Sequence, residues 1–266
     1  RFVQEGAKVV IHGLEKDWGE EVIHALGSEN AALCIGDLQD EATIKELVRC
    51  AILSFGKLDS VVNNAAWVVS SNLDSTDASF FEKILKINTI APFLLIKESL
   101  PYLTAQRGSV LNIGSVNAYS GEPNLLAYSV SKGGLMTLTR NLGDTLHREN
   151  GVRVNQINPG WVLTETEQQR KMSHGLSENW FEKIPSVFAP SGRLIKPEEI
   201  AAAAVYWLGD ECGPISGQIV ELEGFKKVGS GYISIDFSPK GGPKNLAAVA
   251  KVGKLVFPDG NAWTKL

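Results

Sequence analysis

The chain of 266 residues is 44% hydrophobic and 21% charged, which is the composition of a soluble globular protein with one large core and at most a small appendage. Its net charge of −4 comes without a basic stripe or tail, which disfavours nucleic acid and membrane surfaces as partners and favours small molecules. No apolar run reaches the length of a membrane span. Cys34, Cys50 and Cys212 lie far apart without a C-x-x-C motif, as core residues in a reducing compartment do, and this predicts a cytoplasmic protein.

Short apolar, β-branched runs alternate with longer helical patterns through most of the chain. The predicted strands are 7–11, 31–35, 58–63, 108–113, 152–157 and 217–222, and the predicted helices are 15–26, 40–55, 79–103, 125–149 and 197–208. Buried strands separated by helices of this length need crossover connections, which make the sheet parallel and cover both of its faces. We therefore predict a doubly wound α/β fold, in which ligands bind outside the carboxyl ends of the strands.

The pattern changes after residue 225. The segment "GYISIDF" predicts a strand, and "KLVFPDGNAWTKL" predicts two short strands joined by a Pro-Asp-Gly-Asn turn. We therefore divide the chain into a main domain, 1–225, and a β-rich extension, 226–266, which we expect to stabilise the protein or to help it oligomerise.

Polar and small residues follow the predicted strands, where a ligand would bind. Asp37-Leu38 follows the second strand, Asn63-Asn64-Ala65-Ala66 ends the third, Ser115 follows the fourth, and Pro159-Gly160 and then Thr164 follow the fifth. Tyr128 and Lys132 come thirteen and seventeen positions after Ser115, and Asn88 lies in the preceding helix. A spacing of four places Tyr128 and Lys132 on one helix face. Alone, such a pair is weak evidence of function, because Tyr and Lys are common surface neighbours.

In this order and spacing the set resembles the short-chain dehydrogenase/reductase family, from Arg1 to about Phe225. The resemblance implies an NAD(P)-dependent oxidoreductase that interconverts an alcohol and a carbonyl compound. It also implies a homo-oligomer, a dimer or tetramer built on the long helices that hold Asn88 and Tyr128. Within the family the segment 165–191 is a variable substrate lid, and the identity of the substrate is not implied.

The chemistry explains why these residue types are needed. Hydride transfer to a carbonyl carbon requires a proton for its oxygen, and a free tyrosine with a pKa near 10 is poorly matched to neutral pH. A neighbouring ammonium lowers such a pKa, so we expect Tyr128 to act as acid and base with Lys132 as its activator. Ser115 would stabilise charge on the substrate oxygen. The resemblance adds that Lys132 holds the nicotinamide ribose and that Asn88 binds a water that relays protons to Lys132.

The resemblance also implies a set of cofactor-binding residues. Asp37 would bind the adenine amine and Leu38 would contribute its backbone, while Pro159 and Gly160 shape the turn beside the nicotinamide and Thr164 binds its carboxamide. The full set is Asp37, Leu38, Asn64, Ala65, Ala66, Tyr128, Lys132, Pro159, Gly160, Val162 and Thr164. Ala66 stands where the family usually has glycine, and its methyl group bears on how closely the cofactor approaches.

The choice between NAD and NADP depends on the end of the strand in "AKVVIHGLEKD". An acid there binds the ribose 2′-hydroxyl of NAD, and an arginine binds the 2′-phosphate of NADP. The chain has His12, Gly13 and Leu14 instead. The absence of arginine at Leu14 favours NAD, while His12 and Lys16 keep NADP open. His24, His147 and His174 lack metal-ligand spacing, so no metal site is predicted.

The first residues, "RFVQEGAKVV", resemble the end of the family's first helix running into its second strand. The family's first strand and glycine-rich turn, which binds the cofactor pyrophosphate, do not precede them. We therefore expect a sheet without its central strand, with exposed edges on both neighbours. The sequence is then a fragment of a longer product, which we favour because the distant catalytic residues are all present, or a non-catalytic module that binds no dinucleotide.

Overall fold

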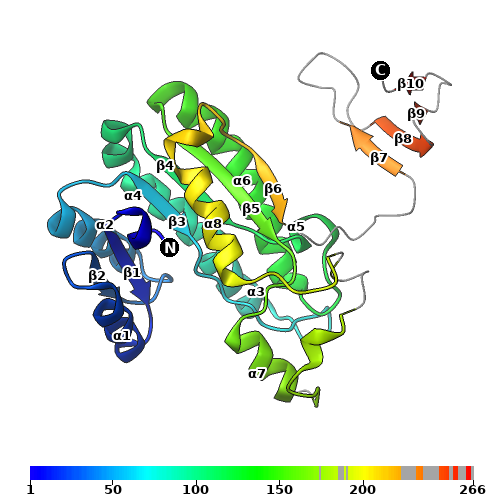
Figure 1. The fold of residues 1–266 in the computed structure, drawn as a ribbon, viewed down its shortest axis with the longest axis horizontal. Helices are drawn as coiled ribbons and strands as arrows, with labels where there is room; N and C mark the ends of the chain where they lie inside the picture. The colour runs from blue at the N-terminus through cyan, green and yellow to red at the C-terminus, as the bar shows by residue number, and fades with distance from the viewer. Residues whose placement is uncertain are drawn as a thin grey trace. The chain divides into compact units, whose positions relative to one another are not determined.

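The computed structural model describes residues 1–173, 175–184, 189, 191–222, 232–235, 246–251, 254–256 and 262–264. The chain forms two compact units, Arg1–Phe225 and Lys226–Leu266. Figure 1 shows the helices and strands of each unit.

The strands of the first unit are all parallel. They are β1 (Val9–Gly13), β2 (Ala31–Ile35), β3 (Ser60–Asn63), β4 (Ser109–Ile113), β5 (Arg153–Pro159) and β6 (Ile219–Leu222). At least one helix lies between each strand and the next along the chain, so parallel neighbours are joined by helical crossover connections. The predicted doubly wound α/β fold is confirmed.

These strands form two separate sheets among the described residues. β1 pairs with β2, and the other four strands form a sheet in the order β3-β4-β5-β6. Neither β1 nor β3 has a second described strand as a neighbour, so each presents one edge of backbone N–H and C=O groups without a ladder partner. The interruption falls at the place that the sequence predicted.

The helices are α1 (Lys16–Leu26), α2 (Glu41–Phe55), α3 (Ala78–Leu85), α4 (Ala91–Gln106), α5 (Asn117–Ser120), α6 (Leu126–Asn150), α7 (Glu165–Ser173) and α8 (Pro197–Leu208). Short 3₁₀ turns cover Val3–Glu5 (η1), Trp180–Glu182 (η3) and Asp210–Cys212 (η4). The helix expected over 79–103 is interrupted by a π-helical turn, η2 (Lys86–Ile90), where the Ala91 amide bonds to the Lys86 carbonyl. The sequence did not predict α5, which is only one turn long. It also did not predict α7, which buries no residue and so shows no helical spacing of apolar residues.

The core lies on both faces of the four-stranded sheet. One cluster joins Val110 and Val154 of the sheet to Ile96 of α4 and Leu146 of α6. A second cluster packs Leu111 and Ile157 against Ala204 of α8. Alternate residues of one strand thus serve opposite faces, and Figure 1 shows α8 on the other side of the sheet from α6. Full burial of each such side chain stabilises the folded state by about 1.5–3 kcal/mol. The packed core on both faces of the sheet therefore holds the carboxyl ends of β4 and β5 in place.

The second unit is an antiparallel sheet in the order β10-β9-β8-β7. Its strands are β7 (Tyr232–Ile235), β8 (Leu246–Lys251), β9 (Lys254–Val256) and β10 (Ala262–Thr264). The three strands expected here are present, while β8 was missed because its alanine-rich sequence has low β-propensity. The predicted Pro-Asp-Gly-Asn turn lies outside the described residues. Across the described parts of the chain, no helix has the length and apolar character needed to cross a membrane.

Candidate active site

The candidate site lies where β4 and β5 end side by side. Beyond the last paired residues of the ladder, the Gly114 amide donates to the Ile157 carbonyl (2.7 Å) and the Val116 amide to the Pro159 carbonyl (3.1 Å). Between them, the Ser115 amide donates to Oδ1 of Asn158 (3.1 Å). Three successive backbone amides therefore attach the segment that carries Ser115 to β5.

The Ser115 hydroxyl is fixed from the other side by α5. Its Oγ accepts a hydrogen bond from the Asn117 amide (3.2 Å), and its carbonyl accepts from the Ala118 amide (3.0 Å). Only 8% of Ser115 is exposed. The side chain therefore has one preferred orientation, with its own proton free to be donated.

Tyr128 and Lys132 lie on one face of the first two turns of α6, as their spacing predicted. The Lys132 Nζ donates to the Ile113 carbonyl at the end of β4 (2.7 Å) and lies 5.8 Å from the centre of the Tyr128 ring. Lys132 is 2% exposed, and a hydrogen bond connects the side chains of Tyr128 and Ser115. The structure thus brings Ser115, Tyr128 and Lys132 together at the carboxyl edge of the sheet.

Burial is the largest cause of the pKa shifts of Tyr128 and Lys132. It raises the pKa of the Tyr128 phenol above its ordinary value of 10, and the hydrogen bond with Ser115 works in the opposite direction. It also lowers the pKa of Lys132 to about 8. We expected the ammonium to lower the pKa of Tyr128, but desolvation disfavours the charged form of both groups and prevails in this structure.

Asn88 lies in the π-helical turn and is fully buried. Its Oδ1 accepts from the Trp67 amide (2.8 Å), and its Nδ2 donates to the Trp67 carbonyl (3.0 Å) and to the Ser131 Oγ (3.0 Å). Ser131 in turn donates to the Tyr128 carbonyl (2.7 Å). The side chain therefore ties the loop after β3 to the helix that carries Tyr128 and Lys132, and its role in a water relay stays a prediction.

The predicted cofactor residues lie at the same edge. Asn64, Ala65 and Ala66 are exposed directly after β3, where small side chains leave the backbone open to a close approach. The Asp37 carboxylate is exposed after β2 and accepts from the backbone amide (2.9 Å) and side chain (2.8 Å) of Gln39. The backbone bond is the main cause of its lowered pKa. Leu38 beside it is half-buried.

The residues after β5 lead into the lid. Pro159 ends β5, and the Gly160 amide donates to the Leu222 carbonyl of β6 (2.9 Å). Val162 forms an isolated parallel bridge with Ile195. The Thr164 Oγ1 accepts from the Glu167 amide at the start of α7 (3.1 Å). That contact leaves the Thr164 hydroxyl proton available, and its bond to the nicotinamide carboxamide stays a prediction.

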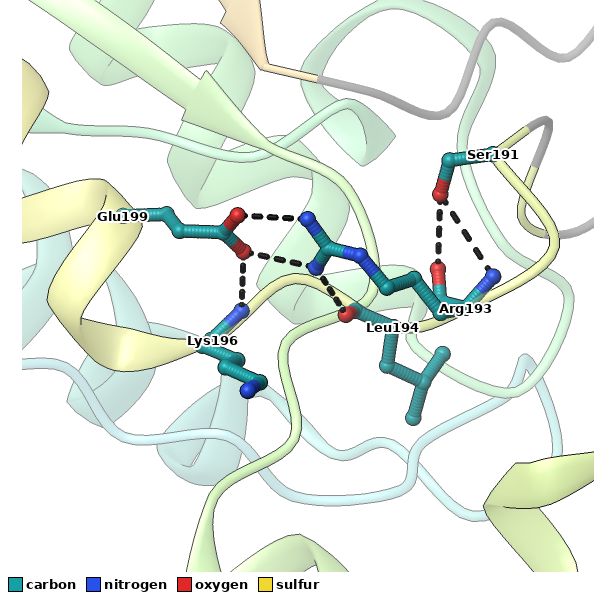
Figure 2. Close-up of polar contacts among 5 residues, drawn as sticks. All are labelled: Ser191, Arg193, Leu194, Lys196 and Glu199. Atoms are coloured by element: carbon teal, nitrogen blue, oxygen red, sulfur yellow. Dashed lines mark hydrogen bonds and ion pairs between the residues drawn. The ribbon is translucent and has the colours of Figure 1, made fainter.

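Trp161 and the segment 165–191, which is expected to form the lid, contain aromatic side chains that pack on one another. Trp161 stacks on Trp180 with ring centres 5.2 Å apart, and the Trp161 Nε1 donates to Glu167 (2.9 Å). The far end of the lid is anchored to α8 by a bidentate ion pair between Arg193 and Glu199 (2.8 and 2.6 Å), which Figure 2 shows together with the bond from the Lys196 amide to Glu199. This pairing lowers the pKa of Glu199 to about 2.

The end of β1 carries the residues expected to select the cofactor. The His12 Nε2 hydrogen-bonds with the Gly36 carbonyl at the end of β2 (2.9 Å), while Leu14 is 61% exposed. Lys16 is paired with Glu20 on α1 (3.3 Å). Among the residues that the structure describes, no group of three or more His, Cys, Asp or Glu could hold a metal ion, and His174 lies outside them.

Two residues that position this site were missed from sequence. Asn158 and Gln156 lie on β5 and are fully buried, although β5 was read as an ordinary apolar strand. The sequence did contain a signal for them, because Gln156 and Asn158 are two positions apart and so lie on one face of the strand. A buried strand with a polar face needs hydrogen-bond partners on that face.

Comparison with known proteins agrees with this geometry. The family model described as enoyl-(acyl carrier protein) reductase matches residues 1–224. An oxidoreductase of uncharacterized specificity from Thermotoga maritima is 35% identical over 84% of this chain and 88% of its own length. The L-fucose dehydrogenase of Mus musculus is 32% identical over 86% of this chain and 83% of its own length. The solved L-sorbose reductase of Gluconobacter frateurii, in complex with NADPH and L-sorbose, shares the fold with a TM-score of 0.79 at 22% identity, covering 85% of this chain and 90% of that one.

The chain belongs to the short-chain dehydrogenase/reductase family of oxidoreductases. The predicted family and enzyme class are therefore confirmed.

Proposed function

We propose that the protein interconverts an alcohol and a carbonyl compound by NAD(P)-dependent hydride transfer. The observation that carries this proposal is the meeting of Ser115, Tyr128 and Lys132 at the carboxyl edge of β4, with Tyr128 hydrogen-bonded to Ser115 and Lys132 buried behind it. The fucose dehydrogenase and the sorbose reductase, whose names describe reactions of this type, support it.

The protein's own residues supply the proton and the binding of the substrate oxygen. In reduction, the Tyr128 phenol donates its proton to that oxygen, while the Ser115 hydroxyl donates a hydrogen bond that stabilises the developing charge. A raised pKa keeps Tyr128 protonated at neutral pH, which is the form that an acid needs. The Lys132 ammonium, still charged below about pH 8, then stabilises the phenolate that remains.

The residues present fit a nicotinamide dinucleotide. The Lys132 ammonium makes one hydrogen bond, to Ile113, and an ammonium has three donors, so two remain for the ribose hydroxyls. The exposed backbone of Asn64, Ala65 and Ala66 faces the same edge. When bound, the nicotinamide supplies or accepts the hydride. We keep NAD as the expected form, because Leu14 offers no positive charge for a 2′-phosphate and Lys16 is already paired with Glu20.

The first test is turnover of a panel of sugars, alcohols and ketones with NAD(H) and NADP(H), comparing the parent protein with Tyr128→Phe. Removing the phenolic proton should lower kcat by about 100-fold to 10,000-fold with little change in KM. Unchanged turnover in Tyr128→Phe rejects Tyr128 as the acid. If neither cofactor shows saturable binding, the alternative of a non-catalytic module stands instead.

We also propose that the enzyme is a homo-oligomer of the cytoplasm. Large apolar side chains on α4 and α6 are exposed, among them Phe93 and Val130, and the faces of these long helices offer a surface for a second copy. The three cysteines are free, in keeping with a reducing compartment. Light scattering of the purified protein measures the oligomeric state directly, and a monomer contradicts this part of the proposal.

A further inference from the structure

A continuous chain of buried hydrogen bonds crosses the four-stranded sheet and ends at Ser115. The Asn63 Nδ2 donates to the Asn112 Oδ1 (2.8 Å), and the Asn112 Nδ2 donates to the Thr139 Oγ1 of α6 (2.8 Å). The Thr139 Oγ1 lies within hydrogen-bond distance of both the Gln156 Oε1 (2.8 Å) and the Leu135 carbonyl (2.9 Å), and its single proton is shared between these two acceptors. Each of these residues is 7% exposed or less. The chain thus links β3, β4, α6 and β5 on the face of the sheet that α6 covers.

The last link is Asn158. Its Oδ1 accepts two hydrogen bonds, from the Gln156 Nε2 (2.7 Å) and from the Ser115 amide (3.1 Å). Both partners are donors, so turning the carboxamide over would place its own N–H₂ group against them and lose both bonds. The orientation of Asn158 is therefore determined by Gln156 at one side and by Ser115 at the other.

Gly114 lets Asn158 come this close. A Cβ at Gly114 would collide with the Asn158 Oδ1 and the Gln156 Nε2. The absence of a side chain next to Ser115 therefore lets the carboxamides of β5 reach the backbone of the neighbouring strand.

Ser115 depends on this contact because no carbonyl serves its amide. Gly114 and Val116 donate to main-chain carbonyls of β5, whereas the Ser115 amide donates to a side chain. Without that acceptor a buried N–H loses its partner, at a cost of about 1–3 kcal/mol, and the backbone would shift to recover one. A shift of about 1 Å at a catalytic group lowers rates by roughly 100-fold.

We propose that Asn158 is a positioning residue for Ser115: its carboxamide oxygen, oriented by Gln156, holds the backbone of Ser115 so that the hydroxyl lies against Tyr128. This assignment rests on the proposed function, in which Ser115 and Tyr128 bind the substrate oxygen. Asn158 itself touches neither the substrate nor the cofactor in this role.

The test compares three variants of the full chain. Asn158→Ala removes the acceptor, and Asn158→Asp keeps an oxygen acceptor in the same place. Asn155→Ala is the matched control, because Asn155 lies on the same strand, is equally buried, and uses its carboxamide to bond the Ile215 carbonyl (2.9 Å) and the Gln218 amide (3.0 Å), away from Ser115. Thermal unfolding measures the loss of stability in each.

Kinetics and NMR separate positioning from stability. We expect Asn158→Ala to lower kcat at least tenfold with KM within about threefold, Asn158→Asp to restore most of the loss, and Asn155→Ala to retain kcat at a similar loss of stability. Tyrosine labelled with ¹³C at Cζ gives a second measurement that needs no substrate, with the Tyr128 signal assigned by Tyr128→Phe. We expect the pKa of Tyr128 to rise in Asn158→Ala and in Ser115→Ala, since both variants should lose the hydrogen bond that lowers it.

The outcomes are distinct. If folded Asn158→Ala keeps the kcat and the Tyr128 pKa of the Asn155→Ala control, the assignment is wrong. If Asn158→Ala does not fold, Asn158→Ser, whose hydroxyl is too short to reach Ser115, is measured against the same control and decides in the same way. If the parent protein turns over no substrate, the proposed function fails, while the Tyr128 pKa in the variants still decides the role of Asn158.

Discussion

The two parallel sheets of the first unit differ in how their ligand-binding edges are built. At the ends of β4 and β5, Ser115 and Asn158 are buried and make at least two hydrogen bonds each, and the buried Lys132 donates to the Ile113 carbonyl. At the ends of β1 and β2, Leu14 and Asp37 are exposed, and the hydrogen bonds of the Asp37 carboxylate are to Gln39 two residues away. The proton-transfer half of the site is therefore preorganised by buried hydrogen bonds, whereas the residues described at the nucleotide half are exposed.

We expect the largest difference between the two edges when a glycine is replaced by alanine at each of them. Gly114→Ala forces the new methyl group into Asn158 and Gln156, whereas Gly13→Ala on β1 meets no atom within 4 Å. We expect Gly114→Ala to destabilise the protein by about 1–3 kcal/mol and to lower kcat/KM about 100-fold by displacing Ser115. Gly13→Ala should melt within about 1 °C of the parent protein, and equal melting temperatures for the two variants would contradict the comparison.

The pH dependence of the reaction tests the buried half further. Burial lowers the pKa of Lys132 to about 8, so its ammonium is lost as pH rises through 8 and the Tyr128 phenolate loses its stabilising charge. We expect kcat/KM for carbonyl reduction to fall about tenfold for each pH unit above about 8. A profile of kcat/KM that stays flat from pH 7 to pH 9.5 is the result that excludes this role for Lys132.

The lowered pKa of Lys132 also makes the free energy of unfolding depend on pH, in the direction opposite to the activity. Because the folded pKa of Lys132 lies below its unfolded value of 10.5, the unfolded chain binds more protons between pH 8 and pH 10.5. The contribution of Lys132 to the free energy of unfolding therefore increases as pH rises through that range. Activity and this contribution to stability should move in opposite directions above pH 8.

The smallest effect is expected on the exposed half. Asp37→Ala removes a carboxylate whose contacts are to Gln39 two residues away. We expect KM for the cofactor to rise by about threefold to tenfold with kcat unchanged, since only binding of the nucleotide is affected. A loss in kcat as large as that of Tyr128→Phe would mean that the two halves are more tightly coupled than their contacts indicate.

The residues whose role depends on spacing were predictable from the sequence. Ser115 follows a predicted strand end, and Tyr128 and Lys132 share one helix face. The resemblance to the family then implied that the three act together. The residues whose role depends on tertiary packing were not. Asn158 reaches Ser115 because β5 lies beside β4 and Gly114 has no side chain. The sequence shows the glycine, but not that the Asn158 and Gln156 carboxamides lie against it.

The protonation of the site could not be read from the sequence either. Spacing predicted that Lys132 lies near Tyr128, and it does, but the direction of the Tyr128 pKa shift depends on burial, which has no signature in the pair itself. The helix over 79–103 shows a similar limit. Its apolar period continues through the π-helical turn at Lys86–Ile90, so the hydrophobic pattern alone does not mark the turn that places Asn88.

The hydrogen-bonded chain from Asn63 to Ser115 matters for anyone who wishes to redesign this enzyme. Its members come from β3, β4, α6 and β5, and the Asn158 oxygen accepts from both Gln156 and Ser115, so a change at one member removes a hydrogen bond from its neighbours. Libraries that aim at new substrates should therefore keep these positions fixed as a block and diversify α7 (Glu165–Ser173), which has no buried residue.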